Sequence, residues 1–206
     1  MRVRQRTVNP DARVVFPAAR RELISACIFP IVNTSPPSSR AVDRVTAGGL
    51  LVGAAFGLAG TLVASPTLQA TLWAIDSIGL VLATTLLAIK CARAGADLAA
   101  GGFLVFAMGE SVLFSGTAAG PSGSVPAFAA GAALWATALV MISAPRLLPL
   151  WLRALGIVAA VLFAVTAARL FAGEPLLPTS SPLPFFAYPF LVANLLGWAW
   201  TLCRTR

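Results

Sequence analysis

The chain contains no histidine, and this absence removes several kinds of functional site. Histidine is a usual ligand of haem iron and of zinc, and it is the general base of Ser-His and Cys-His catalytic pairs. Bis-histidine haem ligation, histidine-ligated zinc and those catalytic pairs are therefore excluded.

Cysteine is also scarce. The three cysteines, Cys27, Cys91 and Cys203, are widely spaced and odd in number, and no CxxC pair occurs. A disulfide framework uses an even set of cysteines, and metal centres built on cysteine commonly use closely spaced pairs. We therefore expect no disulfide framework, no metal site and no bound cofactor.

Charged residues are few as well. They make up 11% of the 206 residues, whereas a soluble domain usually carries about a quarter. Hydrophobic residues make up 58% of the chain, the mean hydropathy is +0.87, and the apolar residues lie in long blocks. Such blocks are typical of spans that cross a bilayer. The composition therefore predicts an all-α integral membrane protein whose main partner is the lipid bilayer.

The net charge of +8 raises the question of nucleic acid, but the position of the cations argues against it. The arginines concentrate in residues 1–41, and the others stand at the edges of apolar blocks, as in membrane proteins. We expect no nucleic-acid partner. Residues 1–41 are interrupted by prolines and are expected to form a basic, disordered tail. Adhesion of these arginines to anionic lipid, at about 1 kcal/mol each, is the alternative role for the tail.

Residues 42–206 are predicted to form a six-helix transmembrane domain with short loops. Each apolar block has about the 20 residues that cross a hydrocarbon core. The joints between blocks are short and contain proline, glycine or serine, which are typical of turns. The predicted spans are roughly residues 45–64, 68–89, 98–117, 125–144, 148–172 and 185–203.

The distribution of cations predicts the orientation. Joint 90–97 contains Lys90 and Arg93, whereas joints 65–67 and 118–124 contain no Lys or Arg. Cation-rich and cation-poor ends alternate through the spans, with Arg169 as the misfit, so both termini are expected to be cytoplasmic. The alanine-rich, arginine-over-lysine composition is typical of GC-rich bacterial genomes. The expected location is therefore a bacterial inner (plasma) membrane.

Small residues at four-residue spacing predict where helices approach closely, because they let two backbones touch. Such lines can pack within the chain, form a homo-oligomer or receive another membrane protein, and the sequence leaves these options open. The predicted helix-packing residues are Gly49, Gly53 and Gly57 on the first span, and Gly156, Ala160 and Ala164 on the fifth.

Two acids lie inside predicted spans. Asp76 is about 12 Å from the outer end of the second span, and Glu110 is about 10 Å from the outer end of the third. The two carboxyls therefore share a depth. Three arrangements satisfy them: Arg169 pairs with one acid, one acid stays protonated and donates a hydrogen bond, or both face a wet cavity. The remaining polar residues expected in this layer are Arg169, Asn194, Ser77, Ser111 and Ser115.

Ionisable residues inside a membrane are functional candidates by default. We therefore expect a protein that binds or translocates a small polar solute, a cation or a proton through an outward-facing acidic pocket. The alternative is a non-transporting structural or assembly protein that docks a partner through its glycine-rich first span. A cavity that reaches the acids favours the first hypothesis. A dry, fully paired network with an exposed glycine ridge favours the second.

An enzyme is not expected. Intramembrane aspartyl proteases carry YD and GxGD motifs, and prenyl transferases carry DDxxD, and the chain contains none of these. Rhomboid-type serine proteases need a histidine partner for the serine, which the chain also lacks.

Overall fold

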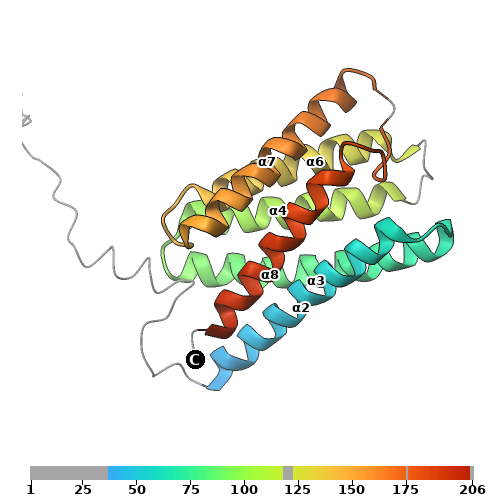
Figure 1. The fold of residues 1–206 in the computed structure, drawn as a ribbon. Coiled ribbons are helices and arrows are strands. Elements are labelled where there is room, and N and C mark those ends of the chain that lie inside the picture. The colour runs from blue at the N-terminus through green and yellow to red at the C-terminus, as the bar shows by residue number, and fades with distance from the viewer. Residues whose placement is uncertain (1–36, 118–122, 175, 205–206) are drawn as a thin grey trace, which may run out of the picture.

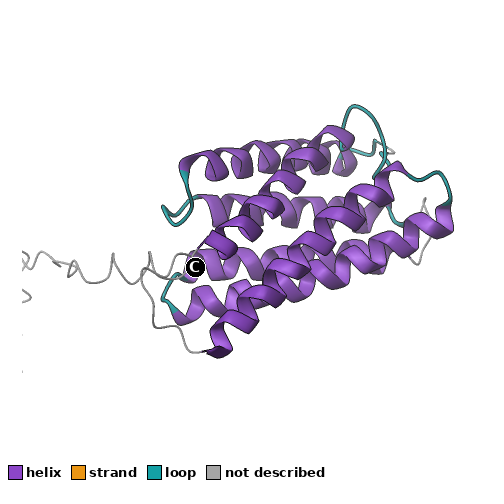
Figure 2. Ribbon diagram, turned by 60° about the horizontal axis from the view of Figure 1, so that its bottom comes forward, coloured by secondary structure: helices purple, strands orange, loops and turns teal. Residues whose placement is uncertain are grey.

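The computed structural model describes residues 37–117, 123–174 and 176–204. Within these residues the regular structure is entirely helical, and six helices are long and apolar enough to cross a membrane (Figures 1 and 2). The prediction of six apolar helices is confirmed at this level. The helices are α2 (Pro37–Leu62), α3 (Pro66–Arg93), α4 (Asp97–Thr117), α6 (Val125–Ser143), α7 (Leu150–Phe171) and α8 (Tyr188–Arg204), with the 3₁₀ turn η1 (Phe185–Ala187) before α8.

The helix boundaries follow local sequence signals. Ser65 is the N-cap of α3, and Pro66 occupies the first helical turn, where its missing N–H is not needed. Gly95, with φ of 72°, lies in the turn between α3 and α4, and this left-handed conformation favours glycine. One boundary differs from the prediction: α2 begins at Pro37, inside the stretch 1–41 assigned to the tail. Residues 1–36 of that tail lie outside the described residues.

Each helix packs against its neighbours in the chain, and α8 also returns to pack against α2 (Figure 1). Aromatic side chains fill the interior between α4, α6, α7 and α8. Phe106 stacks on Trp135 with ring centroids 5.7 Å apart, and Trp135 meets the edge of Phe163 at 5.1 Å. Such stacked and edge-on arrangements are the favourable ones for aromatic rings. Trp135 therefore packs in the core of the bundle.

The glycine line of α2 packs against α3 of the same chain. A Cβ added at Gly49 would lie 2.7 Å from the carbonyl oxygen of Gly79, so only glycine permits this approach of the two backbones. A Cβ at Gly53 would overlap the side chain of Leu80, and one at Gly57 would lie 2.7 Å from Asp76 Oδ2. The sequence leaves open whether this glycine line packs within the chain or against another molecule. In the structure, it packs against α3 of the same chain.

The small-residue line of α7 is only partly a packing face. Gly156 and Ala160 are buried, whereas Ala164 is exposed. Each four-residue step turns the helix about 40° past a full rotation, so a strict four-residue line drifts away from a straight neighbour. The buried face continues through Phe163 and Ala167 instead.

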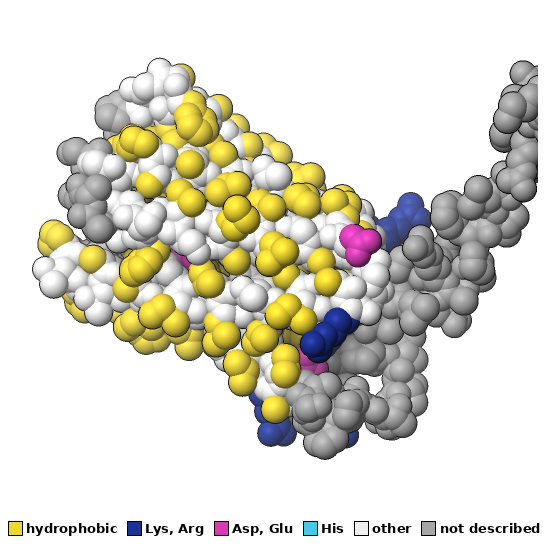
Figure 3. Space-filling view, turned by 180° about the vertical axis from the view of Figure 1, so that it is seen from behind, with side chains coloured by type: hydrophobic (Ala, Val, Ile, Leu, Met, Phe, Trp, Pro, Cys, Tyr) yellow, Lys and Arg dark blue, Asp and Glu magenta, His cyan; other side chains and the backbone are white. Residues whose placement is uncertain are grey.

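The outer surface of the bundle is largely apolar along its length, and most of its charged side chains lie at one end. Large hydrophobic side chains such as Leu51, Ile78 and Val161 are exposed. Figure 3 shows hydrophobic side chains along the helices and the visible Lys and Arg side chains near the end where α2 begins. At that end Lys90 Nζ lies 2.7 Å from Asp43 Oδ1 and joins α3 to α2.

Candidate functional site: a buried acidic cavity

A cavity of about 440 Å³ opens into the bundle at the end opposite to the start of α2. The lining extends from the acids to residues near the helix joints at this end, which we call the mouth and which include Pro66, Thr117, Ser124 and Thr179. Its walls come from α2, α3, α4, α6 and α8. Small-molecule sites in proteins commonly enclose about 300–1,000 Å³, so this cavity is large enough for a small organic solute.

The two acids line this cavity at the same depth, on two helices that run in opposite directions. Gln69, Trp73 and Asp76 follow one another on a single face of α3 and all line the cavity. On α4, which runs in the opposite direction, Thr117 and Glu110 occupy one face in the same way. Asp76 lies seven residues from Gln69, and Glu110 lies seven residues from Thr117, which is about 10 Å along each helix. The shared depth of the acids is as the sequence predicts.

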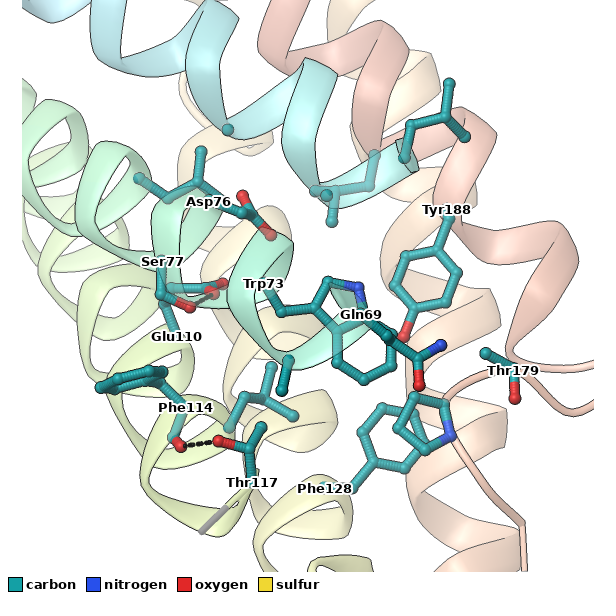
Figure 4. A pocket seen from close by; sticks show the side chains of 18 of the residues that line it. Gln69, Trp73, Asp76, Ser77, Glu110, Phe114, Thr117, Phe128, Thr179 and Tyr188 are labelled. Atoms are coloured by element: carbon teal, nitrogen blue, oxygen red, sulfur yellow. Dashed lines mark hydrogen bonds between the residues drawn. The ribbon is translucent and has the colours of Figure 1, made fainter. Parts of the chain in front are cut away.

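Both carboxyl groups are buried, and each has one oxygen without a partner. The exposed fraction is 8% for Asp76 and 3% for Glu110. Ser77 Oγ donates a hydrogen bond of 2.6 Å to Glu110 Oε1 (Figure 4). Neither Asp76 Oδ1 nor Glu110 Oε2 has a hydrogen-bond partner among the described residues. Buried polar atoms in proteins are nearly always satisfied, so these two unpaired oxygens are unusual and mark this part of the cavity as a candidate site.

No basic side chain of the described residues lines the cavity. The two ion pairs found in that part of the chain, Lys90–Asp43 and Arg169–Glu174, lie elsewhere. A buried carboxylate without a cationic partner is costly in a medium of low dielectric constant. Asp76 and Glu110 therefore lie in this cavity without a cationic partner among the described residues.

The expectation that Arg169 approaches the acids requires correction. Arg169 lies in the last turn of α7, and its Nη2 is 2.6 Å from Oε2 of Glu174, in the turn that follows. This partner is only five residues away in the chain, so the guanidinium is satisfied locally and does not line the cavity.

Three further polar residues predicted for the layer also lie outside the cavity lining. Asn194 is buried and donates to the carbonyl oxygen of Phe190 at 2.9 Å. The hydroxyls of Ser111 and Ser115 donate to carbonyl oxygens of their own helix at 2.9 and 2.8 Å. Polar side chains on helices commonly satisfy themselves against the preceding turn in this way. Of the seven predicted pocket residues, the structure brings together Asp76, Ser77 and Glu110.

The sequence reasoning missed the aromatic walls. Trp73, Phe114, Phe128 and Tyr188 line the cavity, and Tyr188 lies across it from the acids (Figure 4). The signal for Trp73 was available, because it stands three residues before Asp76 on the same helical face. Tyr188 is the single tyrosine of the chain, but nothing in its local sequence connects it to the acids.

Fold and cavity together define an all-helical protein with membrane-length helices and a buried acidic cavity. Among the described residues, no group of three or more Cys, Asp or Glu side chains is arranged to hold a metal ion. Comparison of the chain with protein-family models, curated proteins and solved structures finds no match.

Proposed function

We propose that the chain is a six-span integral membrane protein that binds a small positively charged solute in this cavity. The observation that carries the proposal is the pair of buried carboxyl groups, Asp76 and Glu110, which line a cavity without basic side chains and each keep an oxygen without a hydrogen-bond partner. A cationic solute would balance the charge of these groups, and one that carries N–H groups would also satisfy their hydrogen-bonding capacity. We propose binding of the solute as the activity of the protein. Translocation of the solute across the membrane would require this binding as its first step.

The apolar exterior supports insertion in a membrane, and the cations support an orientation. Lys90, Arg93, Arg146 and Arg204 all lie near the end of the bundle opposite to the cavity mouth. The positive-inside rule then places that end and both termini in the cytoplasm, and the cavity opens to the other side. Arg169 lies at the cavity end, but its charge is matched locally by Glu174. A bacterial inner membrane remains the proposed location.

The alternative function, docking of a partner through the first span, has less support. It required an exposed glycine ridge and a fully paired acidic network. Gly49 and Gly53 are buried against α3, and the acids keep unpaired oxygens beside a cavity. These observations favour a solute site over a structural role for the acids.

Removal of both carboxylates is expected to abolish binding. We propose equilibrium dialysis of labelled tetramethylammonium against the purified protein in vesicles, with Na⁺ and Ca²⁺ as competitors. The double variant Asp76→Asn, Glu110→Gln keeps the shape of both side chains and removes their charge. Its affinity for every cation that binds the wild type should fall by at least about tenfold, which corresponds to about 1.4 kcal/mol.

The matched control is Asp97→Asn, which removes an exposed carboxylate at the opposite end of α4. This variant should bind like the wild type. Saturable binding that is unchanged in the double variant would contradict the proposal. A folded wild-type protein that binds none of these cations would contradict it as well.

A further inference from the structure

The walls of the cavity carry information about the kind of cation that fits. Between the acids at its base and the polar residues at its mouth, the lining is dominated by aromatic and aliphatic side chains. The aromatic residues of the lining are Trp73, Phe114, Phe128, Trp135 and Tyr188, which come from four different helices. An apolar wall of this kind gives no stabilisation to a hydrated inorganic ion.

The base of the cavity is poorly equipped for a bare metal ion. Ca²⁺ takes about six to eight oxygen ligands and Mg²⁺ demands an octahedral set. The side chains at the base supply two carboxyls and the Ser77 hydroxyl, whose oxygens are fewer than either ion takes. A volume of about 440 Å³ also far exceeds the space that one dehydrated metal ion fills. Both features disfavour a metal as the resident solute.

An organic ammonium ion matches the same features. Its charge is satisfied by one or two carboxylates, and its carbon substituents fill apolar space. The faces of aromatic rings attract such cations, by about 0.5–1 kcal/mol at exposed sites and about 2 kcal/mol or more when the contact is desolvated. Aromatic side chains above two buried acids therefore form a suitable environment for a cationic head with an apolar body.

We infer that the solute is an organic ammonium ion with an apolar or aromatic substituent, held by Asp76 and Glu110 and enclosed by Trp73 and its aromatic neighbours. This inference rests on the proposed function and specifies its substrate class. A soluble protonated amine or quaternary ammonium compound carries a cationic nitrogen with carbon substituents. The headgroup of a choline phospholipid carries the same kind of group. The cavity accommodates the head and the first apolar groups in either case.

The inference is tested with a set of probes that differ in one property each. Benzyltrimethylammonium carries charge and an aromatic body, tetramethylammonium carries the charge alone, and neopentylbenzene has the shape of the first without its charge. Binding to the protein in phosphatidylglycerol vesicles should be at least about tenfold tighter for benzyltrimethylammonium than for either of the others. Na⁺ and Ca²⁺ should compete weakly.

The aromatic wall is tested by Trp73→Leu, which keeps an apolar side chain and removes the ring. Affinity for benzyltrimethylammonium should fall about threefold to thirtyfold, as expected for one desolvated cation–π contact. Trp151→Leu is the matched control, because Trp151 is an exposed tryptophan at the other end of the bundle, where it packs on Trp200. Phe114→Leu is a second wall variant at a half-exposed position, for use if Trp73→Leu does not fold.

The outcomes separate the inference from the proposed function. Competition by Na⁺ or Ca²⁺ that is stronger than by benzyltrimethylammonium, with loss of all binding in the double acid variant, would overturn the inference and keep the proposed function. Equal binding of neopentylbenzene, or no effect of either wall variant, would also overturn the inference. Absence of binding by any cation would remove both. Addition of phosphatidylcholine to the vesicles identifies the source: displacement of the probe assigns a lipid headgroup, and no displacement assigns a free solute.

Discussion

Gly49→Ala is expected to lower the free energy of unfolding by about 1–3 kcal/mol, the usual cost of overpacking. The new Cβ would lie 2.7 Å from the backbone oxygen of Gly79 and 3.0 Å from Cβ of Ala83. Neither atom belongs to a flexible side chain, so α2 and α3 would have to move apart. The shift would also disturb the base of the cavity, which both helices line. Denaturant titration of the protein in detergent, followed by tryptophan fluorescence, measures the change.

The neighbouring glycine provides the control. A Cβ at Gly48 meets no atom within 4 Å, so Gly48→Ala should cause no loss of stability. Alanine is a better helix former than glycine by up to about 1 kcal/mol, and a small gain is the expected direction. Equal effects at positions 48 and 49 would show that α2 does not pack on α3 through its glycine line.

Gly57→Leu is expected to reduce cation affinity by at least about tenfold while the helices stay assembled. Gly57 lines the cavity, and an added Cβ would lie 2.7 Å from Asp76 Oδ2. A leucine would therefore displace the carboxyl group and fill the space that we propose for the solute. Dialysis of labelled benzyltrimethylammonium measures the loss. Circular dichroism of the same sample reports whether the helices remain.

Ala55→Leu is the matched control for this substitution. Ala55 lies on the exposed side of the same helix, so the added side chain projects away from the cavity. Its affinity should equal that of the wild type. Wild-type affinity in Gly57→Leu would mean that the solute does not occupy the space beside Asp76, and the site would have to be reassigned.

The helices were largely predictable because apolar blocks of membrane-crossing length are a strong signal along the sequence. Long apolar blocks separated by joints such as Ser65-Pro66 define most of the helix ends to within a few residues, and the start of α2, at Pro37 instead of residue 45, is the exception. The alternation of helix direction then gave Asp76 and Glu110 a common depth, and the structure places both in one cavity. Depth is a property of position along a single helix, so no knowledge of tertiary packing was needed.

The lateral arrangement of the helices was not predictable in the same way. Whether a side chain at a given depth faces the cavity depends on the rotation of its helix, which tertiary packing decides. Asn194 and Tyr188 both belong to α8, yet Tyr188 lines the cavity and Asn194 does not. Arg169 was expected to pair with a buried acid, but it pairs with Glu174 in the turn after α7. This contact between residues close in the chain costs far less conformational entropy than a contact with a distant helix.

The most direct test of an outward-facing, cation-selective cavity uses one cysteine at position 69, with Cys27, Cys91 and Cys203 replaced by alanine. Gln69 lines the cavity between its mouth and the acids. In intact cells, a trimethylammonium methanethiosulfonate and its sulfonate counterpart are added from outside, and their reaction rates are compared. We predict reaction from the outside, at least about tenfold faster for the cationic reagent, and loss of this preference in the Asp76→Asn, Glu110→Gln background. Reaction only after the cytoplasmic side is opened, or a preference that does not depend on the two acids, would contradict the account.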